Sequence, residues 1–207
     1  MIGVKLRISQ IRVRVLAAAL GITFGSLCIS LQHLSAQDQK ASGSLSLGKM
    51  ADGKQWTIQN LNIDIVPSYC YDDAAKNCLQ YGRLYTWESA RRACQSLGAS
   101  WRLPTDEEWR RMAKEYGGVS ADSEDKGKSA YKALLTGGSS GFNAVLGGGR
   151  TEHGEYVRLE VHGFYWAASE IDHATGWSYN FGKGGLALHR QSGSEKQSAF
   201  SVRCIRD

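Results

Sequence analysis

Acidic residues are absent from the first 36 positions of this 207-residue chain, which contain four basic residues: Lys5, Arg7, Arg12 and Arg14. The whole chain has 25 Lys and Arg against 20 Asp and Glu, a formal net charge of +5. The remaining 171 residues have 21 basic and 20 acidic side chains, so they are nearly neutral. A nearly neutral domain has no broad electrostatic attraction for phosphates, which argues against DNA or RNA as a partner.

The sequence also lacks the spacings that hold metal ions. No C-x-x-C motif or close Cys and His pair could complete a tetrahedral zinc site. The histidines after residue 36 show no paired metal spacing: His153, His162, His173 and His189. The Glu-Pro-Asn and Trp-Asn-Asp motifs of calcium-dependent lectins are missing, and the acidic segment 122–125 is interpreted as a solvated loop. We therefore expect no metal and no cofactor.

Basic residues, an apolar run and a small residue follow one another at the N-terminus. Residues 5–14 form the basic segment, residues 15–31 the apolar one, and residues 34–36 resemble a cleavage site. This order predicts a secretory signal peptide over residues 1–36, with export to the periplasm, the outer-membrane surface or the medium. An uncleaved anchor is the alternative, but glycines weaken an apolar run near the lower limit for a span. Leu27 before Cys28 argues against a lipoprotein cysteine.

Removal of the signal peptide leaves four cysteines: Cys70, Cys78, Cys94 and Cys204. An even number in an exported chain predicts two disulfides, and spacing alone does not choose among the three possible pairings. Residues 37–49 are polar at first and contain Gly and Ser, which predicts a flexible tether. Residues 50–207 have the length of a single domain with one core.

Two helices are marked by signals at their ends. Thr86 can cap a helix that stops at Gly98 and has Cys94 on its apolar face. Thr105 and Glu108 fit a capping box at the start of a second amphipathic helix, which stops at residues 117–118. A third, weaker helix is expected over residues 128–135.

Strands are expected in the last third of the chain. Apolar and polar residues alternate over four segments: 157–162, 177–181, 186–189 and 200–205. The Gly-rich segment 182–185 predicts a hairpin turn between two of them. Helices followed by antiparallel strands are typical of an α+β fold.

Five segments occur together in one order: YGRLYTW (81–87), WRLPTDEEW (101–109), SGFNAVLGGGR (140–150), FYWAASE (164–170) and FSVRCIRD (200–207). Over residues 50–207 this order resembles the Fibrobacter succinogenes major paralogous domain family of exported bacterial proteins. WRLPTDEEW is also similar to a segment of the formylglycine-generating enzyme (sulfatase-modifying factor) family. The resemblance implies a C-type-lectin-like fold with two main helices, twisted antiparallel sheets, long ordered loops and neighbouring termini. It also implies the disulfides Cys70–Cys78 and Cys94–Cys204.

Catalysis is not expected. Formylglycine-generating enzymes use a reactive cysteine pair in the C-terminal half of the domain, where this chain has only Cys204, which aligns with a structural cysteine. Residues 137–141 match G-x-S-x-G, but the motif follows a short helix instead of a strand and is interpreted as a turn. Residues 147–149 lack the Lys-Ser/Thr of a phosphate loop and are interpreted as close backbone packing.

The remaining interpretation is a non-catalytic binding module that recognises a protein or a glycan through its loops and C-terminal strands. The candidate ligand contacts are mostly aromatic and polar: Tyr165, Trp177, Tyr179, Asn180, His189 and Arg190. Trp177, Tyr179 and Phe181 share one face of a strand, so that face is either core or binding surface. The alternatives are a structural subunit of a cell-surface assembly and, third, a formylglycine-generating-like enzyme without its catalytic cysteines.

Overall fold

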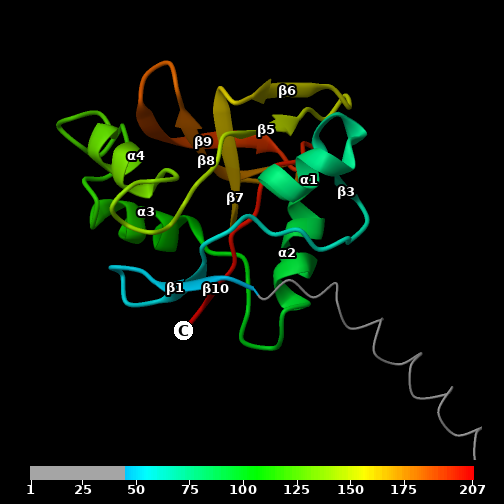
Figure 1. Cartoon of the computed structure of the whole chain (residues 1–207), viewed down its shortest axis with the longest axis horizontal. Helices are drawn as coiled ribbons and strands as arrows, with labels where there is room; N and C mark the ends of the chain where they lie inside the picture. Colours follow the sequence, from blue (N-terminus) through cyan, green and yellow to red (C-terminus); the bar gives the residue numbers. More distant parts are fainter. Residues whose placement is uncertain (1–44) are drawn as a thin grey trace, which may run out of the picture. The chain divides into compact units, whose positions relative to one another are not determined.

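The computed structural model describes residues 45–207, so the predicted signal peptide and residues 37–44 of the predicted tether lie outside the described residues. The largest sheet has five strands in the order β6-β5-β7-β8-β9 (Figure 1). These strands are β5 (Gly147–Arg150), β6 (Tyr156–Leu159), β7 (His162–Glu170), β8 (Thr175–Gly182) and β9 (Ala187–Glu195). All neighbouring pairs are antiparallel except β5 and β7.

Two smaller sheets accompany the large one. The first has the order β1-β2-β10 and contains β1 (Leu47–Lys49), β2 (Gln55–Thr57) and β10 (Ile205–Arg206). The second pairs β3 (Ser68–Tyr69) with β4 (Leu84–Tyr85). Because β2 pairs with both β1 and β10, the two ends of the described chain meet in one sheet.

The helices within residues 45–207 are α1 (Ala75–Tyr81), α2 (Trp87–Gln95), α3 (Asp106–Lys114) and α4 (Lys128–Leu134), with a 3-10 turn η1 over Tyr71–Asp73. The three expected helices are thus confirmed, and together with the antiparallel sheets they confirm the α+β class. The capping box of α3 is present as expected, since the Thr105 hydroxyl accepts from the Glu108 N–H and the Glu108 carboxylate accepts from the Thr105 N–H.

Helices α2 and α3 both pack on β7, and each is fixed to it by a buried tryptophan. The Trp87 indole of α2 donates to the Ala167 carbonyl, and the Trp109 indole of α3 donates to the carbonyl of Trp166. Trp109 is also the centre of the larger core cluster, where Tyr179 stacks on it with the ring centroids 4.8 Å apart. The expected core positions of Trp87, Trp101 and Trp109 are confirmed.

Both disulfides have the pairing that the family resemblance implies. Cys70 is bonded to Cys78, and Cys94 on α2 is bonded to Cys204 just before β10. The second bond ties α2 to the end of the chain across 110 positions of sequence. Two disulfides fit a protein that matures in an oxidising, exported environment.

The C-terminal segment runs through the interior, and the strand predicted over residues 200–205 is therefore incorrect in part. Isolated bridges join Phe200 to Tyr85 and Ser201 to Tyr165, and only Ile205 and Arg206 form a regular strand. Ser201 and Arg203, predicted to face the polar side, are fully buried. The Arg203 guanidinium donates to the carbonyls of three residues, Thr57, Phe142 and Asn143, and to the Asn60 amide oxygen.

Other differences from the sequence expectations are local. The predicted tether reaches too far, because Leu47–Lys49 form β1. The expected strand over 157–162 is interrupted by a turn, because β6 ends at Leu159 and β7 begins at His162. The two strands lie on opposite sides of β5. Leu186 belongs to the turn before β9 and is exposed. Helix α1 was not expected, since it has no side-chain cap and no long apolar stripe.

Close backbone packing explains the Gly-rich segment at β5. Gly148 has a positive φ of 65°, and an added Cβ would lie 2.7 Å from the Tyr71 ring and 2.6 Å from the carbonyl oxygen of Val157. Any side chain there would be strained and would collide with backbone. Residues 137–141 form turns after α4, as the sequence interpretation of the G-x-S-x-G match stated.

Candidate functional site

Two of the six candidate ligand contacts lie in the core. Tyr165 and Tyr179 are fully buried, and their hydroxyls are already hydrogen-bonded within the protein. The Tyr165 hydroxyl donates to the Val145 carbonyl, and the Tyr179 hydroxyl donates to Asp106 of α3. Burial and the nearby Asp106 carboxylate raise the pKa of Tyr179. These side chains present no accessible surface to a ligand.

Asn180 and His189 lie side by side on β8 and β9, where they are register partners. Asn180 is buried, and its amide oxygen lies 2.9 Å from Nδ1 of His162. His189 is half-buried. Both faces of β8 are covered by the rest of the protein. Ser178 and Asn180 on one face are buried, as are Tyr179 and Phe181 on the face that includes Trp177.

Arg190 and Trp177 form a closed cluster with the start of α3. The Arg190 guanidinium binds both carboxylate oxygens of Asp106, at 2.7 and 2.6 Å, and lies over the Trp177 ring. Hydrogen bonding to Asp106 raises the pKa of Arg190. This cluster fixes the start of α3 to β9. Few N–H groups of the Arg190 guanidinium remain to bind a ligand.

A polar groove lies on the other side of the start of α3. It has a volume of about 480 Å³. Its lining comes from α2, α3, β7, the segment between α2 and α3, and the turn between β1 and β2: Lys54, Arg91, Gln95, Arg102, Leu103, Thr105, Glu107, Glu108, Arg111 and Ala168. We call this feature the ionic groove. None of the six candidate contacts is among its lining residues.

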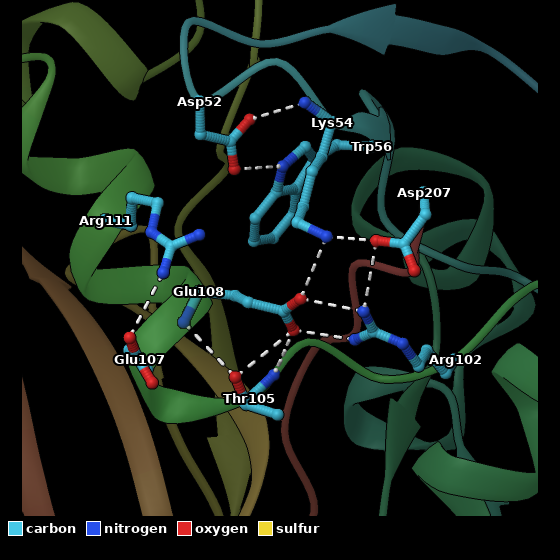
Figure 2. A network of polar contacts seen from close by, with 9 residues as sticks. All are labelled: Asp52, Lys54, Trp56, Arg102, Thr105, Glu107, Glu108, Arg111 and Asp207. Carbon is cyan, nitrogen blue, oxygen red and sulfur yellow. Dashed lines mark hydrogen bonds and ion pairs between the residues drawn. The ribbon is translucent and has the colours of Figure 1, made fainter.

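The floor of the ionic groove is a network centred on Glu108 (Figure 2). Arg102 binds both oxygens of this carboxylate, at 2.6 and 2.7 Å, and Nζ of Lys54 lies 3.4 Å from one of them. Asp207 pairs with Lys54 and lies 3.5 Å from Arg102. Arg102 is held in position because its backbone bonds to Ile205 in both directions.

Electrostatics in the floor are strongly coupled. Burial alone would raise the pKa of Glu108, but hydrogen bonds from Arg102 and from the Thr105 cap outweigh it and lower the pKa to about 2. The hydrogen bonds to Glu108 raise the pKa of Arg102, and the hydrogen bond to Asp207 raises the pKa of Lys54. The floor is therefore fully ionised at neutral pH, and its charges neutralise one another.

The rim of the ionic groove carries two weaker ion pairs, one on each helix. On α2, Arg91 lies 3.3 Å from Glu88, and Gln95 is one turn further along. On α3, Arg111 lies 3.1 Å from Glu107. Each pair joins residues of a single helix, and the Glu88 and Glu107 side chains are 67% and 80% exposed. Such exposed pairs contribute little stability and exchange readily with other partners.

The chemistry of the lining favours binding of a charged group. Four basic and two acidic residues line the ionic groove, although the domain as a whole is nearly neutral. Leu103 and Ala168 supply a small apolar area. The lining residues that the structure describes include no Cys, Ser or His that could act as a nucleophile or general base near neutral pH.

The sequence pointed to two residues of this site, but as a helix cap and not as part of a groove. Thr105 and Glu108 were expected as a helix cap, and the same Glu108 carboxylate also anchors the floor. Lys54 and Asp207 are more than a hundred positions apart, and no local pattern could have brought them together. The three-residue spacing of Arg91 from Glu88 and the four-residue spacing of Arg111 from Glu107 were the signals available for the rim.

Within residues 45–207, no group of three or more His, Cys, Asp or Glu is placed to hold a metal ion. The Asp125 carboxylate instead accepts hydrogen bonds from the Gly127 and Ser129 N–H groups at the start of α4. In the same range, no helix combines the length and the apolar character needed to cross a membrane.

Comparison with known proteins gives one family. The sequence model described as Fibrobacter succinogenes major domain matches residues 45–206. The match begins at the start of the described chain, five residues before the predicted domain boundary, and so includes β1. No curated protein matches the chain.

Proposed function

This chain belongs to the Fibrobacter succinogenes major domain family, and we propose that it is an exported, non-catalytic binding module whose ligand site is the ionic groove. The observation that carries this proposal is the rim of the groove, where Arg91 of α2 and Arg111 of α3 line the same concavity as an internally neutralised floor. A binding site works best when its supporting side chains are already fixed. Here Arg102, Glu108 and Lys54 provide that support.

The proposed fold for this module is C-type-lectin-like. Two features support it: α2 and α3 flank β7, and both ends of the described chain join β2. We extend this proposal to the similarity between WRLPTDEEW and the formylglycine-generating enzymes. In this chain the segment forms the cap of α3 and contributes Arg102 and Glu108 to the groove floor. The groove occupies the place between helices and sheet, which differs from the C-terminal strand surface expected from the sequence.

A non-catalytic role is supported by the state of the one partly buried carboxylate in the groove. A general acid or base works best with a pKa near the operating pH, whereas the pKa of Glu108 is about 2. The four cysteines of the described domain are all in disulfides. A thiolate mechanism therefore has no free cysteine among the described residues to use.

Blocking the groove tests the proposal. Gln95 is exposed on α2, so Gln95→Trp would place an indole in the groove without disturbing the core. Gln80→Trp makes the same change on α1, outside the groove, and is the matched control. We expect the unmodified protein and Gln80→Trp to bind the envelope fraction of the producing bacterium, and Gln95→Trp to lose that binding.

Two outcomes would contradict the proposal. Equal retention of all three proteins would show that the groove is not the binding site. If the protein binds no envelope component and instead self-associates in sedimentation experiments, the structural-subunit alternative would replace the binding module.

A further inference from the structure

We propose that the ionic groove binds an acidic peptide segment of a partner protein, whose carboxylates take the places of Glu88 and Glu107 on Arg91 and Arg111. This inference rests on the proposed function and adds the chemical class of the ligand. Arginine is suited to the task because its planar fork binds a carboxylate through two parallel hydrogen bonds.

The division between floor and rim supports an exchange of partners. Glu108 in the floor is 12% exposed and is bound by Arg102, Lys54 and the Thr105 cap, so a ligand cannot easily displace it. Glu107 in the rim is 80% exposed and makes a single contact with Arg111 at 3.1 Å. A ligand carboxylate can replace Glu107 because that exposed pair is worth little by itself.

The two rim arginines are the groups that favour an anion. The charges around the groove balance, because Lys54 and Arg102 pair with Glu108 and Asp207 in the floor, and Arg91 and Arg111 pair with Glu88 and Glu107 on the rim. Arg91 also lies over the Trp87 ring, 4.9 Å from its centroid. The preference for a carboxylate therefore comes from the rim guanidinium groups, whose own carboxylate partners are exposed and weakly held.

The remaining lining favours a peptide over an acidic glycan. Sugar sites commonly use an aromatic face, and no aromatic residue is among those that the described structure places along the groove. Gln95 offers an amide that can both donate to and accept from a peptide bond. Leu103 and Ala168 provide a small apolar area for side-chain carbons of the peptide.

The test uses capped synthetic peptides and isothermal titration calorimetry on the full chain. The probe is Glu-Asp-Glu-Asp, and its uncharged counterpart Gln-Asn-Gln-Asn is the control ligand. We expect measurable binding of the acidic peptide, at least ten-fold weaker binding of the counterpart, and an affinity that falls with added salt. Inorganic phosphate and trigalacturonate serve as the other anions.

Four variants locate the interaction. Arg91→Gln and Arg111→Gln should each weaken binding about five- to ten-fold, which corresponds to the loss of one charge-assisted contact. Arg110→Gln changes an equally exposed arginine of α3 that pairs with Asp122 outside the groove, and it should leave the affinity unchanged. Glu107→Gln should strengthen binding about two- to five-fold, because it removes the competing carboxylate. A purely structural role of these side chains would not produce this increase.

The outcomes separate the inference from the proposed function. Equal binding of both peptides, tighter binding of trigalacturonate or phosphate than of the acidic peptide, or equal losses in Arg110→Gln and Arg111→Gln would overturn the inference. If Gln95→Trp abolishes envelope binding while the acidic peptide does not bind, the ligand class is wrong and the binding module stands. If Gln95→Trp has no effect on envelope binding, the proposed function itself fails.

Discussion

Glu108 combines two roles at one position of the chain. Its carboxylate closes the capping box of α3 and at the same time holds Arg102 and Lys54 in the floor of the ionic groove. The cap was predictable, because Thr105 and Glu108 are three residues apart on a helix that starts after Pro104. The ion network was not, because Lys54 and Asp207 reach Glu108 only through the folding of both chain ends onto β2.

We expect Glu108→Gln to lower the free energy of unfolding by about 1–3 kcal/mol near neutral pH, because Gln cannot accept both Arg102 contacts. The pKa of Glu108 in the folded protein is about 2, below its ordinary value of 4.5. A carboxylate with a lowered pKa stabilises the fold above its unfolded pKa and loses that effect as the pH falls through the folded one. Urea denaturation should therefore show a difference between the two proteins that narrows from about pH 4.5 downwards.

The exposed neighbour provides the control for this prediction. Glu107→Gln alters the rim pair alone and should change stability by no more than about 0.5 kcal/mol. If the effect of Glu108→Gln is the same at about pH 3 as at about pH 7, the carboxylate does not act through ionisation.

Arg203 is a second residue whose role the sequence did not indicate. The alternation over 200–205 put it among the polar positions of an expected strand, but its guanidinium is fully buried and bound by oxygen atoms of four residues: Thr57, Asn60, Phe142 and Asn143. Among the described residues, these partners are neutral. Burial accordingly lowers the pKa of Arg203.

We expect Arg203→Met to cost about 3–5 kcal/mol, because it leaves several buried carbonyl groups without a donor. Arg203→Lys should be nearly as severe, since an ammonium cannot reach oxygens on both sides of the guanidinium plane. Arg206→Met, three positions later in β10, is the control: Arg206 is half-buried and within residues 45–207 its guanidinium donates to the Gln55 side chain only, so its loss should cost less than about 1 kcal/mol. Equal urea midpoints for the two positions would contradict the structural role of Arg203.

At the level of elements, helices α2, α3 and α4 were predictable, α1 was not, and the C-terminal strands were only partly so. Thr86 and Thr105 occupy the N-cap positions of α2 and α3, although only the Thr105 side chain makes the cap hydrogen bond. Glycines follow within a few residues of both helix ends, so these signals are local in sequence. The alternation of residues 200–205 was misleading because a segment enclosed on all sides buries both faces. Enclosure depends on tertiary packing, which a pattern of period two does not record.

The two disulfides should differ in their effect on stability, because they close loops of different length. On the chain-entropy account, replacing Cys94 and Cys204 by Ala would cost up to about 4.8 kcal/mol, and replacing Cys70 and Cys78 up to about 2.6 kcal/mol. Equilibrium denaturation of the two double variants would measure both values. A larger loss from the shorter loop would show that local packing at α1, and not chain entropy, determines the effect.

At the level of the whole molecule, charge and topology act together. The domain is almost neutral, so it attracts no polyanion over its whole surface, yet α2 and α3 gather basic residues at one groove. Trp87 and Trp109 fix these helices to neighbouring carbonyls of β7, which keeps Arg91 and Arg111 facing the same concavity. The sequence predicted the helices and the core tryptophans, but not which surface they would leave open.

The central claim is that ligands bind at the ionic groove and not at the surface of β8 and β9. The most direct test is an NMR titration of the isotopically labelled protein with the capped Glu-Asp-Glu-Asp peptide. We expect the largest shift changes at Arg91, Gln95 and Arg111, and little change at Trp177 or His189. Changes confined to Trp177, His189 and their neighbours on β8 and β9 would contradict the account.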